Sequence, residues 1–555
     1  MKNKLLAFIM AAAITPLSTL ANTTVVHNIK GYTPTHNGNV SKFSALAFKD
    51  GRVVNLGAND IVASYPDATV IDGQGKVMLP GLIDAHGHII GLGQNLMRLD
   101  LRDTSSVEEI GEKLKAFAAQ SEQQWIIGRG WNQENWPVKE FATAKDLDKY
   151  VSDRPVVLSR IDGHAIWVNT KAMELAGFKA QVMSPEGGEI IYDEQGQPSG
   201  VFIDKAEQLI TNSIPKSSQK ELSLALDKAG EHLLSLGITG AHDAGIDFDT
   251  WHVYKQRAEQ GSLPVRIYAM LSAADPQLET MLKAGKVLDK QDMLSIRSVK
   301  VYADGALGSR GAALLEDYAD RKGHRGLMLE TQEQLQEIFK LCFKHGFSAH
   351  THAIGDRANR EVLDAYESVF KSTGGKLLRN RIEHAQIVEP SDITRFKELK
   401  IIPSMQPVHA TSDMHMATQR LDEKQLEGAY AWQTFLQQRS KVAAGSDFPV
   451  ELANPFHGLY SAITRQDHRG QPEAGWRPQE LLTREQALHA FTLDAAYSAH
   501  QEFKLGSLEK GKWADFILID TDVMSAPVQK VWQTQVLQTW LAGEKRYERE
   551  ESSRE

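Results

Sequence analysis

Two histidines, His86 and His88, stand one residue apart at the end of the mostly apolar stretch 77–85. Side chains at positions i and i+2 of a β-strand point to the same face, so both imidazoles can reach one ion. Imidazole nitrogen is a common ligand of divalent transition metals, and the small Gly87 between the histidines allows tight packing on the opposite face. The spacing predicts part of a metal site; a surface pair or a hydrogen-bonded core pair is the alternative.

Further candidate ligands close later apolar segments of the chain. His352, His384 and Asp447 each stand at the end of a short apolar run. The single cysteine, Cys342, excludes an internal disulfide and a multi-thiolate zinc site, so histidine and carboxylate are the available ligands. These residues complete a metal centre if the fold brings the ends of their segments together.

The elements that must position these residues are short strands that alternate with amphipathic helical patterns between about residues 80 and 500. Repeated βα units imply a parallel sheet, and this many of them favours a (β/α)8 barrel over an open doubly wound sheet. Polar residues at the C-terminal ends of strands also favour the barrel, because barrel enzymes collect their chemistry there. The expected strands include 266–271, 298–302, 347–352, 381–384, 401–405 and 442–447.

Both ends of the chain have β-like patterns, and residues 43–57 predict a hairpin. A few strands at either terminus cannot bury a face alone, so we expect residues 22–78 and 501–555 to pair into one small β-sandwich domain. The barrel, residues 79–500, then lies between them as a continuous insertion. Residues of about 95–210, with several tryptophans among glycine and proline, interrupt the βα repeat and are expected to form a lid or subdomain over the barrel mouth.

The amino-acid composition indicates a globular protein and argues against nucleic acid as a partner. The chain has 555 residues, of which 42% are apolar and 24% charged, as in a globular protein with a large core. The net charge is −9 and no Lys/Arg stripe is present, so nucleic acid is not an expected partner.

The first 21 residues have the pattern of a signal peptide, with Lys2 and Lys4 before an apolar stretch and small residues that predict cleavage near Ala21. An uncleaved N-terminal anchor is the alternative. No later run of about 18 apolar residues is found, so we expect a periplasmic or secreted protein without membrane spans.

An ordered set of motifs along the mature chain resembles the amidohydrolase superfamily. Within it, the resemblance is to amidohydrolase family 3, the branch similar to N-substituted formamide deformylase. A single motif such as Gly-Ser-Asp carries little information, whereas the ordered set is specific. The motifs lie at residues 81–88, 162–165, 237–239, 300–311, 352–358, 381–384, 445–447 and 506–515.

This resemblance implies a centre of two divalent ions, usually zinc. His86 and His88 on the first barrel strand would hold the more buried ion, and His352 and His384 on the fifth and sixth strands the other ion. Asp447 on the eighth strand would bind metal and act as the catalytic proton carrier.

Lys300 is the sixth ligand that the resemblance implies, as an N-carboxylated lysine that bridges both ions. Burial next to cations lowers the pKa of an amine and so favours the neutral form that takes up carbon dioxide. An ion pair with Asp304, four residues on, is the alternative for Lys300. His350, two residues before His352, is the alternative ligand on the fifth strand.

Three residues are candidate substrate contacts. His164 lies in the expected lid, and a purely structural histidine is equally consistent with its position. Trp131 is expected to line a pocket, with packing inside the lid as the alternative. Arg310 could recognise a carboxylate through its planar fork.

We therefore predict a metal-dependent hydrolase that cleaves a C–N bond of a small amide-like molecule by attack of metal-bound hydroxide on a polarised carbonyl. Asp447 would take the proton of the attacking water. Two other readings stay open: an exported regulatory or binding protein on the same fold, and a hydrolase of esters, lactones or cyclic ureas. A homodimer is also left open.

Overall fold

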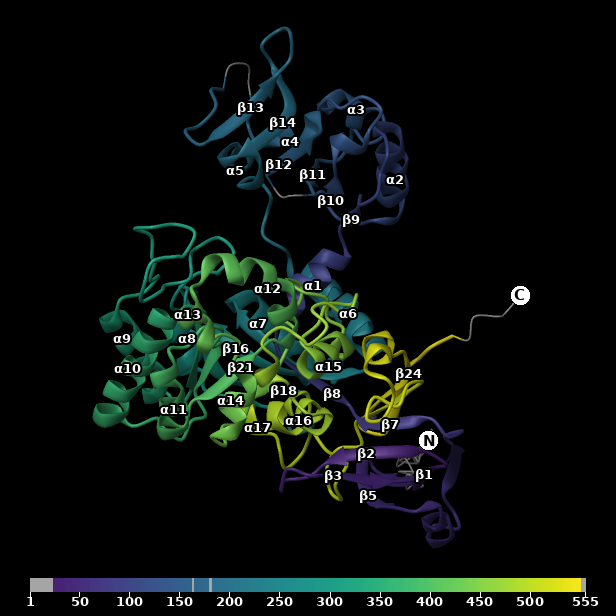
Figure 1. The fold of residues 1–555 in the computed structure, drawn as a ribbon. Helices are drawn as coiled ribbons and strands as arrows, with labels where there is room; N and C mark the ends of the chain where they lie inside the picture. Colours follow the sequence, from purple (N-terminus) through teal and green to yellow (C-terminus); the bar gives the residue numbers. More distant parts are fainter. Residues whose placement is uncertain (1–22, 162–163, 179–181, 551–555) are drawn as a thin grey trace, which may run out of the picture.

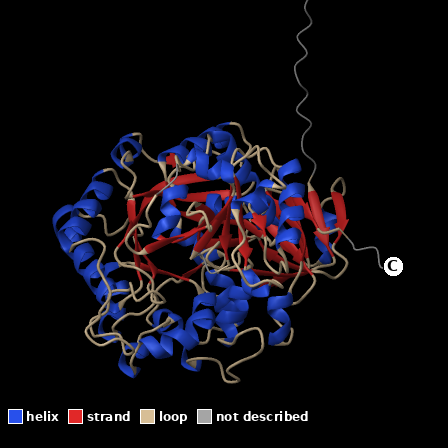
Figure 2. Ribbon diagram, turned by 90° about the horizontal axis from the view of Figure 1, so that it is seen from above, coloured by secondary structure: helices blue, strands red, loops and turns tan. Residues whose placement is uncertain are grey.

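The computed structural model describes residues 23–161, 164–178 and 182–550, so the expected signal peptide lies outside the described residues. The centre of the molecule is a barrel of eight parallel strands surrounded by helices, which confirms the predicted (β/α)8 fold (Figures 1 and 2). In their order around the barrel the strands are β8 (Leu82–Gly87), β15 (Ile238–Ile246), β16 (Arg266–Ser272), β18 (Leu294–Tyr302), β19 (Ser348–Ala353), β20 (Arg381–His384), β21 (Ile402–Met405) and β22 (Ala443–Ala444).

The barrel closes where the chain that leaves the short β22 meets β8. The backbone N–H of Asp447 donates to the carbonyl of His86 at 2.7 Å, and the N–H of His88 donates to the carbonyl of Phe448 at 2.7 Å. A side chain at Gly445 would collide with this seam, because its Cβ would lie 2.5 Å from the backbone nitrogen of His86. The first and last motifs of the barrel are therefore neighbours.

The helices around the barrel begin and pack as their sequences predict. In α6 (Gln219–Ser235), Ser218 and Glu221 form a capping box, in which each side chain bonds to the other residue's backbone N–H. In α10 (Asp356–Thr373), the buried residues include Val362, Tyr366 and Val369, a spacing that puts apolar side chains on one face. The other helices of this region are α1 (Ile89–Leu96), α7 (Phe248–Glu259), α8 (Leu278–Lys283), α9 (Gln332–Lys344), α11 (Pro390–Leu399), α12 (Pro407–Arg420), α13 (Glu423–Glu427), α14 (Trp432–Gln437), α15 (Pro455–Thr464), α16 (Arg484–Ala490) and α17 (Leu493–Ser498).

Strands from both chain ends form two further sheets beside the barrel. One has the order β5-β4-β1-β6 and the other the order β25-β24-β23-β7-β2-β3. β7 pairs with β23, so Leu79 lies opposite Ile517 and the two ends share one hydrogen-bonded sheet, as the predicted fold requires. The strands are β1 (Thr24–His27), β2 (Lys30–Pro34), β3 (Val40–Phe43), β4 (Ala45–Lys49), β5 (Arg52–Gly57), β6 (Thr69–Asp72), β7 (Val77–Pro80), β23 (Phe516–Ile519), β24 (Val536–Leu541) and β25 (Glu544–Glu548).

A buried ion pair fastens the terminal strands to the barrel. Arg266 at the start of β16 donates to both carboxylate oxygens of Asp515, at 2.6 and 3.0 Å. The side chains of Arg266 and Asp515 are 3% and 8% exposed, so water competes little for either charge. The geometry is bidentate, the arrangement in which Arg binds carboxylates most strongly.

The insertion folds around a core of its own and stands over the side of the barrel where α1 and α12 lie (Figure 1). Its sheet has the order β13-β14-β12-β11-β10-β9. No helix in the described part of the chain is long and apolar enough to cross a membrane. The insertion contains β9 (Leu99–Asp100), α2 (Val107–Gln120), β10 (Ile126–Trp131), α3 (Ala144–Asp148), β11 (Val156–Arg160), β12 (Ala165–Val168), α4 (Thr170–Leu175), β13 (Gly188–Tyr192), β14 (Pro198–Asp204) and α5 (Gln208–Thr211).

Candidate metal centre

His86 in β8 and His88, directly after the end of β8, face Asp447, which follows β22. The carboxylate oxygen Oδ1 of Asp447 lies 3.2 Å from Nε2 of His88 and 3.7 Å from Nε2 of His86. One ligand atom from each of the three residues lies within 4.8 Å of the others, so the three residues are grouped closely enough to be candidate ligands of one metal ion. Asp447 reaches this position with a backbone φ of 64°, in the left-handed region that non-glycine residues seldom adopt.

Burial and charge have opposite effects on the carboxyl group of Asp447. Burial raises its pKa, but the hydrogen bond from His88 and the electrostatic interaction with the surrounding imidazoles outweigh burial and hold the pKa well below its usual range. Asp447 is therefore an ionised carboxylate at neutral pH. It can bind a cation or accept a proton.

Lys300 points into the same centre from β18. Its Nζ lies 3.3 Å from Nε2 of His86, and the side chain is 1% exposed. Burial lowers the pKa of Lys300 to about 8, although the negative charges of Glu383 and Asp447 act in the opposite direction. A much larger fraction of this amine is neutral near pH 7 than in an exposed lysine.

Asp304 does not pair with Lys300, so the predicted alternative for that lysine is wrong. The carboxylate of Asp304 instead accepts the backbone N–H groups of Ala313, Ile354 and Gly355 at 2.8–2.9 Å. It fixes the loop after β18 to the loop after β19. Burial raises the pKa of Asp304 to about 7, partly offset by these three hydrogen bonds.

His352 and His384 complete the set of six predicted ligands. Their ring centroids lie 4.5 Å apart, and the ring of His384 lies 4.8 Å from that of His86. Nδ1 of His384 is 2.8 Å from Oε1 of Gln406, an acceptor, so Nδ1 carries the proton and Nε2 keeps its lone pair. Burial lowers the pKa of His352 to about 3 and that of His384 well below 6.5, so both are neutral, the form that binds metal.

Glu383 belongs to the centre, although we did not predict a role for it. Its Oε2 accepts a hydrogen bond of 2.6 Å from Nδ1 of His86, which leaves Nε2 of His86 free for an ion. Consecutive residues of a regular strand point to opposite faces, yet Glu383 and His384 both reach the ring of His86. The positive φ of His384, 75°, ends the strand geometry and explains this. An acidic residue directly before a predicted ligand is the signal that could have identified it.

His409 is a second residue that the prediction missed. It lies in the first turn of α12, and its Nε2 is 3.8 Å from Oδ2 of Asp447. His384, His409 and Asp447 form a second group whose ligand atoms lie within 4.8 Å of one another. The predictions placed a ligand at the ends of the fifth, sixth and eighth strands but none at the end of the seventh, β21. The Gln-Pro-x-His sequence directly after β21 could have indicated one.

The residues present fit divalent metal ions. The donors are imidazole nitrogens, a carboxylate and an amine of lowered pKa, which is the chemistry that zinc prefers when thiolates are absent. Nε2 of His352 and Nε2 of His409 are buried and have no hydrogen-bond partner among the described residues. Buried polar atoms normally have partners, so two orphaned nitrogens at one place indicate a missing ligand.

Trp131 and His164, the two predicted substrate contacts in the insertion, do not lie at the metal centre. The side chain of Trp131 is 1% exposed and packs against Trp136 and Trp167, so the prediction that it lines a pocket is wrong and the packing alternative holds. Its indole N–H donates to the carbonyl of Leu158 at 2.7 Å. His164 is exposed, and its Nδ1 lies 2.8 Å from Oδ1 of Asp204 within the insertion. The structure does not bring either residue to the centre.

Arg310, a predicted substrate contact, and His350, the alternative ligand, both contact other protein residues instead. The guanidinium of Arg310 donates to both carboxylate oxygens of Asp320, at 3.1 and 2.7 Å, so its fork is already occupied by the protein. His350 lies deeper in the barrel, with Nε2 3.0 Å from the hydroxyl of Ser348 and Nδ1 3.7 Å from Oε1 of Glu383. His352, not His350, is therefore the residue of β19 that reaches the centre.

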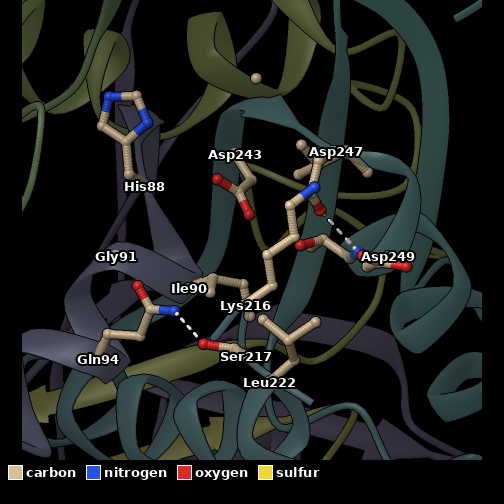
Figure 3. A pocket seen from close by; sticks show the side chains of 13 residues that line it. His88, Ile90, Gly91, Gln94, Lys216, Ser217, Leu222, Asp243, Asp247 and Asp249 are labelled. Carbon is tan, nitrogen blue, oxygen red and sulfur yellow. Dashed lines mark hydrogen bonds between the residues drawn. The ribbon is translucent and has the colours of Figure 1, made fainter. Parts of the chain in front are cut away.

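A polar cavity of about 380 Å³ adjoins the metal centre at His88 (Figure 3). His88 and Asp243 lie at its upper side in Figure 3, and Gln94 and Ser217, joined by a hydrogen bond of 3.1 Å, at its lower side. Asp243 is 4% exposed and accepts the backbone N–H of Ile89 at 3.2 Å. The cavity has the size and polarity for a small molecule with several hydrogen-bonding groups.

Comparisons with known proteins agree with this geometry. A family model described as "Amidohydrolase family", amidohydrolase family 3, matches residues 69–547. The chain is 32% identical to Protein LONG AFTER FAR-RED 3 of Arabidopsis thaliana, over 91% of this chain and 88% of that protein. It is 25% identical to N-substituted formamide deformylase of Arthrobacter pascens, over 91% and 95% of the two chains. An uncharacterized metal-dependent hydrolase from Pyrococcus furiosus has a similar structure, with a TM-score of 0.76 and 28% identity, covering 91% of this chain and 100% of that one. The chain therefore belongs to amidohydrolase family 3.

Proposed function

We propose that this hydrolase uses two divalent metal ions, zinc in the simplest case, to cleave the C–N bond of a small amide-like substrate. The observation that carries the proposal is the convergence of His86, His88 and Asp447 with Lys300, a buried lysine of lowered pKa, beside a polar cavity. Two ions held there would polarise the carbonyl group of the substrate and lower the pKa of the attacking water.

Asp447 is the residue to which we assign proton transfer. Its Oδ1 faces His86 and His88, while Oδ2 faces the opposite side, toward His409. An ionised carboxylate in this place can accept the proton that the attacking water loses. The same proton must reach the leaving nitrogen, because an amine leaves far more readily than an amide anion.

Lys300 and Glu383 serve the metal ions, Lys300 as a ligand and Glu383 through His86. The neutral amine of Lys300 can add carbon dioxide, and the resulting carbamate would offer two oxygen atoms to the ions. Glu383 holds His86 in the tautomer whose Nε2 faces the centre. The neutral states of His352 and His384 need no proton release before metal binding.

The substrate class rests on similarity. One relative is named for the hydrolysis of N-substituted formamides, an amide C–N bond. We extend this class of bond, but not that substrate, to the present chain. The cavity at His88 supports a small polar molecule over a long peptide.

The test is a substrate screen on zinc-loaded protein. N-substituted formamides, N-acyl amino acids and dipeptides represent the proposed bond, while esters, lactones and cyclic ureas represent the rival hydrolase. Each reaction is repeated with Asp447→Asn protein to exclude a contaminating enzyme. Turnover of an amide above that of the matched ester supports the proposal. Ester-only turnover contradicts the C–N assignment, and no turnover by protein with both ions contradicts the enzymatic role.

A further inference from the structure

His409 occupies a place at the barrel mouth that none of the six predicted ligands fills. α12 begins at Pro407, directly after β21, and this turn carries His409 toward Asp447. The side chain of His409 is 13% exposed, and its Nε2 is buried without a hydrogen-bond partner among the described residues. A nitrogen that is withdrawn from water and aimed at a carboxylate requires a partner.

The distance to Asp447 shows that the carboxylate alone is not that partner. Nε2 of His409 and Oδ2 of Asp447 are 3.8 Å apart, beyond the usual N–H···O range of about 2.7–3.2 Å. Zinc bonds to nitrogen and oxygen are about 2.0–2.2 Å, so two donors of one tetrahedral ion lie about 3.3–3.6 Å apart, close to the separation of this pair. The separations of Asp447 from His86 and His88, 3.7 and 3.2 Å, lie on either side of this donor–donor distance.

His409 lies close to His384, which is a predicted ligand of the second ion. The two rings are nearly parallel, at 18° with centroids 6.0 Å apart, and their ligand atoms belong to one group within 4.8 Å. Nδ1 of His384 is held by Gln406, three residues before His409, so one short segment orients both imidazoles. His86 and His88 approach Asp447 at Oδ1, and His409 approaches it at Oδ2.

We propose that His409 is a further ligand of the second metal ion, beside His384. The inference rests on the proposed metal centre and adds a residue to it. It also places the second ion on the Oδ2 side of Asp447. The ion of His86 and His88 then lies on the Oδ1 side, and the carboxylate stands between the two.

The test compares His409→Ala with His415→Ala, a matched control on the same helix whose histidine is exposed. Full-length protein is stripped with chelator, and the binding of Zn²⁺ is followed by calorimetry and by elemental analysis. Thermal unfolding of each metal-free variant verifies the fold. We expect wild-type and His415→Ala protein to bind two ions per chain. For His409→Ala we expect one ion of unchanged affinity and a second weakened by at least about tenfold.

A second variant distinguishes the loss of a ligand from a general effect of the substitution on folding. His409→Asp returns an oxygen ligand to the position, and we expect it to recover part of the second-ion affinity that His409→Ala loses. Two ions bound with wild-type affinities by His409→Ala would overturn the assignment of His409 and leave the proposed function intact. Wild-type protein that binds no Zn²⁺ would instead overturn the metal centre, and His409 with it.

Discussion

Replacement of Glu383 by Gln tests whether the affinity for metal depends on the negative charge of Glu383, which acts through His86. Glu383 and His86 are 0% and 1% exposed, and their contact of 2.6 Å is a charge-assisted hydrogen bond. Such bonds contribute about 1.5–3 kcal/mol, compared with about 1 kcal/mol for a neutral one. The difference, about 0.5–2 kcal/mol, corresponds to a factor of roughly 2–30 in the affinity for the ion that His86 holds.

The Gln side chain has the same size, so this loss is electrostatic. Its amide can still accept from Nδ1 of His86 through the oxygen, but without the negative charge that makes the imidazole more basic. Zn²⁺ titration of metal-free protein gives the affinity directly. Glu398→Gln, an exposed position on α11, serves as the control. Equal affinities for Glu383→Gln and the control would refute the reasoning that Glu383 acts through the tautomer and basicity of His86.

Three further outcomes follow from particular residues. Asp447→Asn keeps an oxygen for metal but accepts no proton near neutral pH, so kcat should fall by about two to four orders of magnitude; near-normal turnover with both ions bound would show that another residue carries the proton. Arg266→Met leaves the buried Asp515 without its cation and should cost about 3–5 kcal/mol in urea unfolding, whereas a double variant with Asp515→Leu should recover part of this. With a pKa of about 8, Lys300 is neutral in about a tenth of molecules at pH 7 and about nine tenths at pH 9, so at equal dissolved ¹³CO₂ the formation of its carbamate in metal-free protein, followed by NMR, should be faster at pH 9. Lys300→Ala protein should lack this one resonance.

Much of the site could be predicted because strands obey simple geometry. The two-residue period of a strand placed His86 and His88 on one side, and the convergence of parallel strands at one edge placed His352, His384 and Asp447 nearby. The alternative pairing of Lys300 with Asp304 failed for a related reason. A four-residue spacing makes neighbours on a helix, whereas in an extended chain it separates two side chains by about 13 Å.

Other residues depend on features that appear only in three dimensions. Glu383 and His384 meet at the same centre because His384 adopts a positive φ, which no periodic pattern indicates. His409 reaches the centre through the turn that joins β21 to α12. Trp131 was assigned to a pocket on residue type, but a large aromatic side chain suits the core of the insertion equally well, and the neighbouring tryptophans supplied that core.

The seam between β8 and β22 has a consequence for how the centre is assembled. Asp84 accepts the hydroxyl of Ser446 at 2.6 Å, a contact between residues 362 positions apart in the sequence. A contact across so long a segment costs more chain entropy to close than a local contact, so non-local pairings of this kind form slowly. The full metal affinity should therefore arise only when the ring of strands is complete. A fragment that ends before residue 443 retains five of the six predicted ligands. It lacks β22 and the chain directly after it, which closes the barrel against β8 and brings the ligands together.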